Sequence, residues 1–391
     1  MIYVHIPYCR SFCTYCDFYS EVASGCSTYE GFSKALSSEI SARESEIRMN
    51  IQAPSGVNTL YIGGGTPSVL PLSVLEALLT SLERIGCGRR FDEFTMEVNP
   101  EDIVEKGHSY VEGLLKLGVD RISMGVQSFD DATLKWMNRR HDSARAKKAY
   151  AILEETGVGN ISIDLIFGLP QLDLQGWEDN LSKALNVSPS GKLPAHVSSY
   201  QLSVEEGSAL AAMMVKGKWS EATDEHCAQQ YETLCERLRE AGYHHYEISN
   251  FAQPGYEAVH NSAYWSHVPY VGLGPGAHSF GSVSDKGAER RWNNPDLAAY
   301  IAAGVSGVFS AVQGGEILTW EQLELERLML GLRTSKGLPS AFLERCCSPD
   351  SLQSALNAGH LQVADESCSA NPYLRIPEQY FFISDSIIAD L

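Results

Sequence analysis

The chain has few features of a membrane protein or a nucleic-acid-binding protein. Its 391 residues contain no run of about 18 apolar residues, so we expect no membrane-spanning helix. The opening residues MIYVHIP lack both the basic segment and the apolar stretch of a secretory signal. Lys and Arg number 30 against 49 Asp and Glu, and the net charge is −19. Because binding to a nucleic-acid backbone depends on excess Lys and Arg, we expect no nucleic-acid partner. The lack of a secretory signal and of a membrane span predicts a cytoplasmic protein.

Ten cysteines are present, and a reducing compartment favours thiols or metal ligands over disulfides. Cys9, Cys13 and Cys16 fall within eight positions of each other, in CRSFCTYC. A disulfide uses two thiols and a structural zinc site uses four ligands, whereas three thiolates can hold a cluster and leave one metal position open. A zinc site completed by His5 and a set of incidental thiols are the alternatives. We favour an iron–sulfur cluster whose fourth iron binds a further ligand.

Short apolar runs rich in β-branched and aromatic residues alternate with longer helical patterns. The predicted strands are 2–6, 57–63, 94–99, 121–128, 161–168 and 197–203. The predicted helices between them are 28–48, 72–85, 101–117, 143–156 and 175–186. Parallel neighbouring strands need crossovers of this length, so the alternation predicts an α/β fold with a parallel sheet. The sheet could close as a barrel or remain open.

Polar or small residues stand at or just past the C-terminal ends of these strands. They are the cysteine loop, Gly63–Thr66, Glu97, Gln127, Asp164, Tyr200 and Gln201. In an α/β barrel the C-terminal strand ends face one mouth, where active sites form. The sequence therefore predicts that these widely separated residues meet in one site.

The strand–helix rhythm weakens after residue 203, and the composition changes again near Thr319. Residues 221–241 have the spacing of an amphipathic helix. Thr319 and Gln322 fit a capping box ahead of an apolar stripe, and a second helix is expected near 339–346. We divide the chain into a cluster-bearing domain at 1–205, an extension that completes the core at 206–315, and a small helical or winged-helix-like domain at 316–391.

The Cys-x3-Cys-x2-Cys spacing resembles the signature of the radical S-adenosylmethionine (SAM) superfamily. That resemblance implies a partial (β/α)6 barrel and a 4Fe–4S cluster on Cys9, Cys13 and Cys16. It also implies that the amino and carboxylate groups of SAM chelate the open iron. An electron from a donor protein then passes through the cluster and cleaves SAM to a 5′-deoxyadenosyl radical.

Several further segments resemble one branch of this superfamily, the oxygen-independent coproporphyrinogen III oxidase-like proteins. They are YVHIPYCRSFCTYCDF, YIGGGTPS, MEVNPED, ISMGVQSFDDATLKWMNRRH, DLIFGLPQ, YEISNFA and HNSAYW, which together span about residues 3–333. The resemblance implies a set of SAM-binding residues. Tyr3 and Tyr15 would pack on SAM, and Gly64, Gly65 and Thr66 would approach its methionine part. Glu97, Gln127, Arg139 and Asp164 would bind its polar groups, with Arg139 placed for a bidentate contact to the carboxylate.

Two features separate the chain from the porphyrinogen-oxidising enzymes of this branch. Those enzymes have a fourth cysteine, Cys-x-Cys, where this chain has Phe18. HNSAYW, at 260–265, resembles the heme-binding motif of heme chaperones of the HemW type, which implies His260 as a ligand to heme iron. A histidine hydrogen-bonded within a protein core is the alternative reading of the same motif.

We therefore expect a protein that binds a 4Fe–4S cluster, SAM and heme and delivers heme to hemoproteins. The main alternative is an oxygen-independent coproporphyrinogen III oxidase, which decarboxylates propionate side chains through a radical. A radical SAM enzyme acting on another substrate is a third. The acceptor hemoprotein, the formation of a homodimer and the cleavage of SAM in turnover stay open.

Overall fold

The computed structural model describes residues 1–22, 26–52, 56–281, 287–365 and 371–391. Its main sheet has nine strands in the order β11-β1-β4-β5-β6-β7-β8-β10-β9. The central strands are β1 (Ile2–Ile6), β4 (Thr59–Gly64), β5 (Glu93–Val98), β6 (Arg121–Gln127), β7 (Asn160–Phe167) and β8 (His196–Gln201). These six strands follow chain order and pair in parallel. The predicted α/β fold and its six strands are confirmed.

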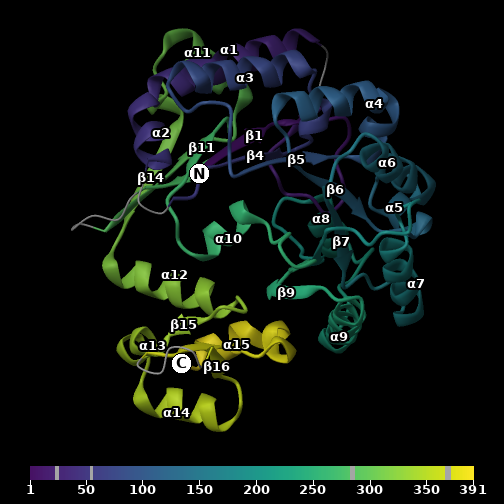
Figure 1. Ribbon diagram of the computed structural model, residues 1–391, viewed down its shortest axis with the longest axis vertical. Helices are drawn as coiled ribbons and strands as arrows, with labels where there is room; N and C mark the ends of the chain where they lie inside the picture. Colours follow the sequence, from purple (N-terminus) through teal and green to yellow (C-terminus); the bar gives the residue numbers. More distant parts are fainter. Residues whose placement is uncertain (23–25, 53–55, 282–286, 366–370) are drawn as a thin grey trace.

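Helices cover the outer face of this curved sheet, as Figure 1 shows for α3, α4, α6 and α7. The first helices are α1 (Cys26–Ala42), α2 (Glu44–Ile51), α3 (Leu72–Arg84), α4 (Pro100–Leu117), α5 (Asp131–Trp136), α6 (Ser143–Glu155) and α7 (Leu174–Leu185). Each predicted crossover helix is present, and the first is divided into α1 and α2. The arrangement leaves the C-terminal strand ends on one side, together with the loop that follows β1.

Local sequence signals explain where these helices start and stop. In α3, Leu75, Leu78, Leu79 and Leu82 recur at helical spacing and are buried against the sheet. Helix α4 has proline at its first position and ends at Gly118, whose φ of 97° is left-handed. Proline suits a helix start because it lacks the N–H group, and glycine suits the position after the last turn because it adopts positive φ without strain.

Residues beyond 205 complete both edges of the main sheet. Strand β11 (Val271–Leu273) pairs in parallel with β1, while β10 (Asn250–Ala252) pairs antiparallel with β8 and with β9 (His244–Glu247). Within the described residues β11 and β9 do not pair, so the barrel stays open. The same region contains α8 (Ala209–Val215), α9 (Asp224–Glu240), α10 (Val259–Trp265) and α11 (Leu297–Ser306). It also carries η2 (Ser310–Val312) and the sheet of β12 (His278–Phe280), β13 (Ala288–Asn293) and β14 (Gln313–Leu318).

The C-terminal region has helices and a small sheet of its own. Its elements are α12 (Trp320–Leu332), β15 (Leu338–Pro339), α13 (Ser340–Cys346), α14 (Pro349–Asn357), β16 (Gln362–Asp365), β17 (Tyr373–Arg375), η3 (Glu378–Ile383) and α15 (Ser384–Ala389). The strands pair in the order β15-β17-β16, which agrees with the winged-helix-like expectation. The capping box of Thr319 and Gln322 is present at the start of α12, as predicted. Figure 1 shows this domain at one end of the molecule, below α10 and the barrel.

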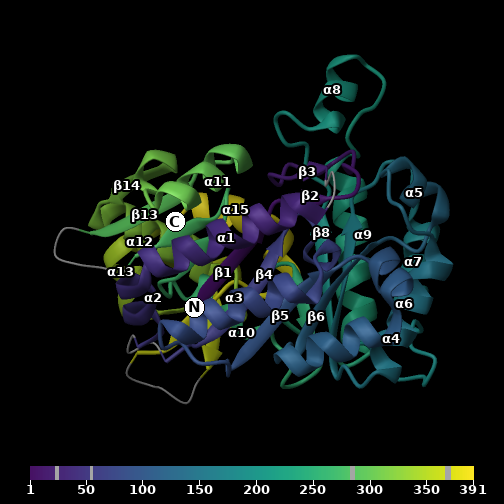
Figure 2. The ribbon, with the colours of Figure 1, turned by 90° about the horizontal axis from the view of Figure 1, so that it is seen from above.

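Two short strands and a turn of helix complete the loops beside the strand ends. Strands β2 (Tyr8–Cys9) and β3 (Glu21–Val22) flank the cysteine loop, and η1 (Pro67–Val69) follows β4. Figure 2 shows β2 and β3 on the same side of the molecule as α8, and the amide of Leu210 donates to the carbonyl of Thr14. In the described ranges no helix is long and apolar enough to cross a membrane.

Candidate cofactor-binding pocket

A pocket of about 700 Å³ opens at the C-terminal ends of the parallel strands. It is bounded by the loop after β1, the turn after β4 and inward-facing residues of β5 to β8. The predicted cluster and SAM residues that line it are Cys9, Cys13, Tyr15, Cys16, Gly64, Gly65, Thr66, Glu97, Gln127, Arg139 and Asp164. Tyr3 and His260 do not line it. The structure thus brings these residues together, although Cys9 and Asp164 are 155 positions apart in the sequence.

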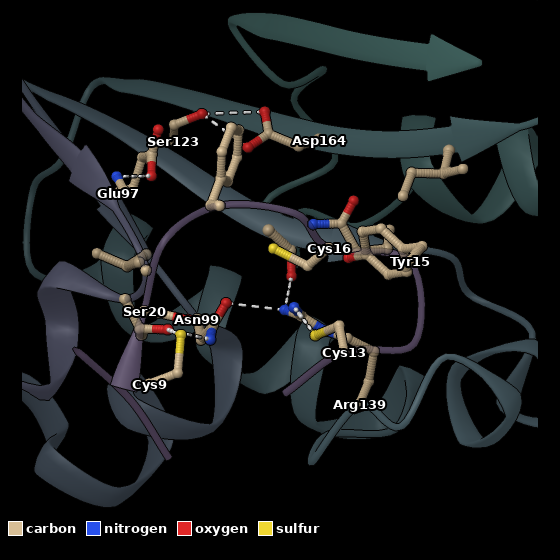
Figure 3. A pocket seen from close by; sticks show the side chains of 18 of the residues that line it. Cys9, Cys13, Tyr15, Cys16, Ser20, Glu97, Asn99, Ser123, Arg139 and Asp164 are labelled. Carbon is tan, nitrogen blue, oxygen red and sulfur yellow. Dashed lines mark hydrogen bonds between the residues drawn. The ribbon is translucent and has the colours of Figure 1, made fainter. Parts of the chain in front are cut away.

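The three cysteines lie on one loop at the pocket entrance (Figure 3). Cys9 is buried with its Sγ 3.4 Å from Thr66 Oγ1, and Cys13 Sγ accepts a hydrogen bond from Arg139 Nη1 at 3.4 Å. In the described parts of the chain, no three His, Cys, Asp or Glu side chains are gathered around a single point. Burial raises the pKa of Cys9 and that of Cys16, the latter to about 11, so metal binding must displace thiol protons.

The glycine turn after β4 lets backbone approach the cysteine loop closely. Gly64 has a φ of 105°, and a Cβ atom there would lie 2.7 Å from the ring of His5. A Cβ on Gly65 would lie 2.7 Å from the carbonyl oxygen of Tyr8 and 3.1 Å from Cys9 Sγ. Neither position accepts a side chain without displacing its neighbours, which explains why glycine is needed at both.

Arg139 connects the cysteine loop to the strand ends. Its Nη2 donates to Asn99 Oδ1 at 2.8 Å and to the Gly125 carbonyl at 2.6 Å, while Nη1 donates to Cys13. Its Nε is buried without a hydrogen-bond partner among the described residues. Gln127 lies close by and has a φ of 67°. This conformation is energetically unfavourable for residues other than glycine, and it is common at functional sites.

Two acidic residues project into the deeper part of the pocket. Glu97 accepts hydrogen bonds from Tyr61 OH at 2.8 Å and from the Gly64 amide at 3.2 Å. Asp164 accepts from Ser123 Oγ at 2.8 Å, as Figure 3 shows. Burial raises the pKa of both carboxyl groups, and that of Glu97 reaches about 7. A carboxyl group whose pKa lies near neutral pH can either donate or accept a hydrogen bond when a ligand binds.

Several residues that line the pocket are not predicted by the sequence patterns. They include Tyr61, Arg121, Ser123, Ser198 and Asn261. Arg121 is 1% exposed, and its Nε has no hydrogen-bond partner within the described ranges. A signal for part of this set was available, because Arg121, Ser123, Gly125 and Gln127 alternate along β6 and therefore share one face.

Tyr3 lies behind the pocket wall. Strand pairing places it opposite Tyr61, with the ring centroids 6.0 Å apart, and its OH lies 3.2 Å from His5 Nδ1. His5 Nε2 lies 2.8 Å from the carbonyl oxygen of Tyr19, so both nitrogens of this ring are hydrogen-bonded. Tyr61, rather than Tyr3, provides the aromatic ring at this part of the pocket.

His260 lies within α10 and is 0% exposed. Its Nδ1 is 2.7 Å from Thr59 Oγ1 and its Nε2 is 3.0 Å from Tyr264 OH. Burial lowers the pKa of His260 to about 3, so the ring is neutral at physiological pH. A neutral imidazole is the form that binds metals, but both nitrogens here are engaged in hydrogen bonds.

Comparison with known proteins agrees with this fold. A model of the radical SAM superfamily matches residues 3–184. The chain is 34% identical over 341 residues to the Heme chaperone HemW of Bacillus subtilis, covering 86% of this chain and 84% of that protein. It is 30% identical over 378 residues to the mitochondrial Radical S-adenosyl methionine domain-containing protein 1 of Danio rerio, covering 93% and 82%.

A solved structure extends the comparison to the whole fold. Coproporphyrinogen III oxidase HemN from Escherichia coli, described as a radical SAM enzyme, matches with a TM-score of 0.77 at 19% identity. The match covers 100% of this chain and 89% of that chain. The fold is that of the radical SAM superfamily. Within that superfamily, the chain belongs to the family of the HemW proteins.

Membership of the superfamily implies a 4Fe–4S cluster and SAM, and the residues present suit both. Three thiols on one loop are the soft donors that an iron–sulfur cluster takes, and their number leaves one iron free. The glycine turn packs directly against the cysteine loop, since a Cβ atom on Gly65 would lie 3.1 Å from Cys9 Sγ. The unpartnered Nε of Arg139 is expected beside a ligand that brings a hydrogen-bond acceptor.

Proposed function

We propose that this protein is a heme chaperone that binds a 4Fe–4S cluster, SAM and heme and delivers heme to hemoproteins. The observation that carries this proposal is the similarity to proteins named Heme chaperone HemW over most of both chains. The HNSAYW segment and Phe18, in place of a fourth cysteine, support it from the sequence. The acceptors would be respiratory or other hemoproteins.

In this proposal the pocket binds the cluster and SAM. Cys9, Cys13 and Cys16 hold the cluster, which supplies an electron and an open iron when bound. Gly64 and Gly65 hold the backbone after β4 next to the cysteine loop, where the methionine part of SAM would lie against it. Arg139 is placed beside Cys13 to attract a carboxylate.

The remaining polar residues of the pocket would bind the ribose and amino groups of SAM. Glu97 and Asp164 accept hydrogen bonds from ligand hydroxyl or ammonium groups, and Gln127 and Thr66 contribute further polar contacts. Tyr15 lines the entrance from the cysteine loop and provides an aromatic surface. Tyr3 acts in this scheme through Tyr61, on which it packs, and not by direct contact.

Heme is proposed to bind at α10 through His260, with Tyr264 and Trp265 as neighbouring aromatic surfaces. Burial keeps the imidazole neutral, which suits an axial ligand. Coordination requires that one ring nitrogen give up its hydrogen bond to Thr59 or to Tyr264. Heme binding at this position therefore includes a local rearrangement of α10.

Heme titration with a turnover assay tests the proposal. Reconstituted wild-type protein is expected to bind heme with a shifted Soret band, and His260→Ala should weaken or alter the band while the iron–sulfur content stays the same. His108→Ala, at an exposed position on α4, is the matched control and should leave the band unchanged. The proposal is refuted if wild type and His260→Ala give identical heme spectra and the protein converts coproporphyrinogen III to protoporphyrinogen IX with SAM and a reductant.

The wider setting follows from the same chemistry. A thiolate-held cluster is compatible with a reducing compartment such as the cytoplasm. An electron donor for the cluster is required only if SAM is cleaved. A homodimer is a further expectation, to be measured by the mass of the reconstituted protein in solution.

A further inference from the structure

Helix α10, which carries HNSAYW, is part of the wall of the SAM pocket. Asn261 is one of the residues that line the pocket, although its neighbour His260 is fully buried on another side of the helix. The first turn of α10 is fixed to the barrel by Glu93, the first residue of β5. This carboxylate accepts from the Val259 amide at 2.8 Å and from the His260 amide at 3.0 Å.

Asn261 has the properties of a ligand-binding residue. Its side chain makes no hydrogen bond to any other described residue, and it is half-buried at the pocket surface. A carboxamide has an NH2 group that donates and an oxygen that accepts hydrogen bonds. These two groups match the N7 acceptor and the N6 donor on one edge of adenine. An amide with free donors inside a pocket that suits a nucleoside is expected to bind it.

Tyr61 provides a second connection between α10 and the pocket. Its ring lies 5.1 Å from the His260 ring, and its OH donates to Glu97 Oε1 at 2.8 Å. One face of Tyr61 thus supports His260, while its hydroxyl fixes a carboxylate in the pocket. Movement of His260 removes one aromatic contact of Tyr61, which also packs on Tyr3, and so loosens the hydroxyl that holds Glu97.

Coordination of heme iron by His260 is incompatible with this arrangement. Nδ1 is held by Thr59 of β4, so using it requires α10 to separate from the barrel. Nε2 is held by Tyr264, whose ring packs edge-on against Tyr270 at 4.7 Å, so using it requires Tyr264 to leave that packing. A porphyrin is too large to reach either nitrogen of a fully buried ring without one of these movements.

We propose that Asn261 contacts the nucleoside bound in this pocket, and that heme coordination by His260 and SAM binding therefore weaken each other. The protein would load heme when the pocket is empty and release it when SAM restores α10 to the barrel wall. This inference rests on the proposed heme-binding function. Since the coupling is a property of two binding equilibria, each ligand must weaken the other by the same factor.

Two titrations test the coupling. Heme is titrated into cluster-reconstituted protein, without reductant, in the absence of SAM and in its saturating presence, and followed by the Soret band. SAM binding is measured by calorimetry with and without heme. We expect each ligand to raise the dissociation constant of the other about fivefold or more. Tyr61→Phe keeps the ring beside His260 but loses the bond to Glu97, so it should reduce the coupling. Tyr243→Phe, which loses a buried tyrosine hydrogen bond to the Pro194 carbonyl, should not.

The Asn261 contact has a separate test. Asn261→Ala should weaken SAM binding about fivefold, the loss expected for one or two neutral hydrogen bonds. Ser262→Ala, the next residue of α10, lies outside the pocket lining and is the control. Circular dichroism confirms that each variant is folded. Unchanged SAM affinity in Asn261→Ala overturns this part of the inference.

The outcomes distinguish the inference from the proposed function. If heme binds in a manner that depends on His260 but its affinity is the same with and without SAM, the coupling is wrong and the chaperone function stands. If wild type fails to bind heme, the proposed function is wrong and the coupling falls with it. The SAM affinity of Asn261→Ala is measured without heme and decides that contact in either case.

Discussion

The carboxyl group of Glu97 makes the free energy of unfolding of the protein depend on pH. Its carboxyl group is held by Tyr61 and by the Gly64 amide, and burial raises its pKa from 4.5 to about 7. Because the pKa is higher in the folded state, folding favours the protonated form. The stabilisation is fully present below pH 4.5 and is lost as the pH rises through about 7.

The size of this change in the free energy of unfolding follows from the change in the pKa of Glu97 on folding. A difference of about 2.5 pKa units corresponds to about 3.4 kcal/mol, since one unit is worth about 1.36 kcal/mol. The side chain of Glu97 is half-buried at the pocket surface, and we expect solvent screening to reduce the loss of unfolding free energy between pH 5 and pH 8 to about 2 kcal/mol. Glu97→Gln has the same shape but no titration, so it should lose less stability over this range than the wild type does.

Urea unfolding of the cluster-free protein at pH 5 and at pH 8, followed by tryptophan fluorescence, measures this difference. Groups that do not interact with Glu97 titrate equally in both proteins and cancel in the comparison. Glu225→Gln, at an exposed position in the first turn of α9, is the control and should follow the wild type at both pH values. If wild type and Glu97→Gln lose the same free energy of unfolding between pH 5 and pH 8, the assigned environment of Glu97 is wrong.

Two further predictions concern the pocket entrance. Cys13→Ala should lose the brown absorbance and most of the roughly four irons per chain expected for a 4Fe–4S cluster. Cys227→Ala, which replaces a buried cysteine outside the pocket, is the control and should keep both. Full iron content in Cys13→Ala would contradict the ligand assignment. Arg139→Ala should weaken SAM binding about tenfold or more, since hydrogen bonds to charged groups contribute about 1.5–3 kcal/mol. Unchanged SAM affinity by calorimetry, with the cluster intact, would count against that role.

The sequence was sufficient to predict the six central strands and the convergence of their polar ends. Each strand is a short run rich in β-branched and aromatic residues followed by a helix of crossover length, and this pattern fixes a parallel sheet. Because parallel strands present their C-terminal ends on one side, residues as distant as Cys9 and Asp164 could be placed in one site before their contacts were known.

Residues whose position depends on register or on distant segments could not be predicted in the same way. Tyr3 and Tyr61 are paired on neighbouring strands, and only the three-dimensional structure shows that Tyr61, and not Tyr3, lines the pocket. The contact of Asn261 with the pocket depends on Glu93, 168 positions away, which fixes the start of α10. The HNSAYW motif predicts His260 as a heme ligand, but the burial of His260 against Thr59 has no counterpart in the local sequence.

The composition of the barrel interior explains why bound cofactors should contribute to folding. The interior of an α/β barrel is ordinarily filled by layers of large apolar side chains. Here the inward positions around the pocket floor hold Arg121, Ser123, Asp164 and Ser198, which leave space and place ionisable groups away from bulk water. Such groups are costly unless they are paired or hydrogen-bonded, and Arg121 Nε has no partner among the described residues. A ligand that supplies those partners binds the folded state alone and stabilises it by about 2.7 kcal/mol at a concentration of about 100 times its dissociation constant. An empty pocket is therefore the less stable form of the fold, and we expect the same polar interior that weakens it to favour a polar, charged ligand.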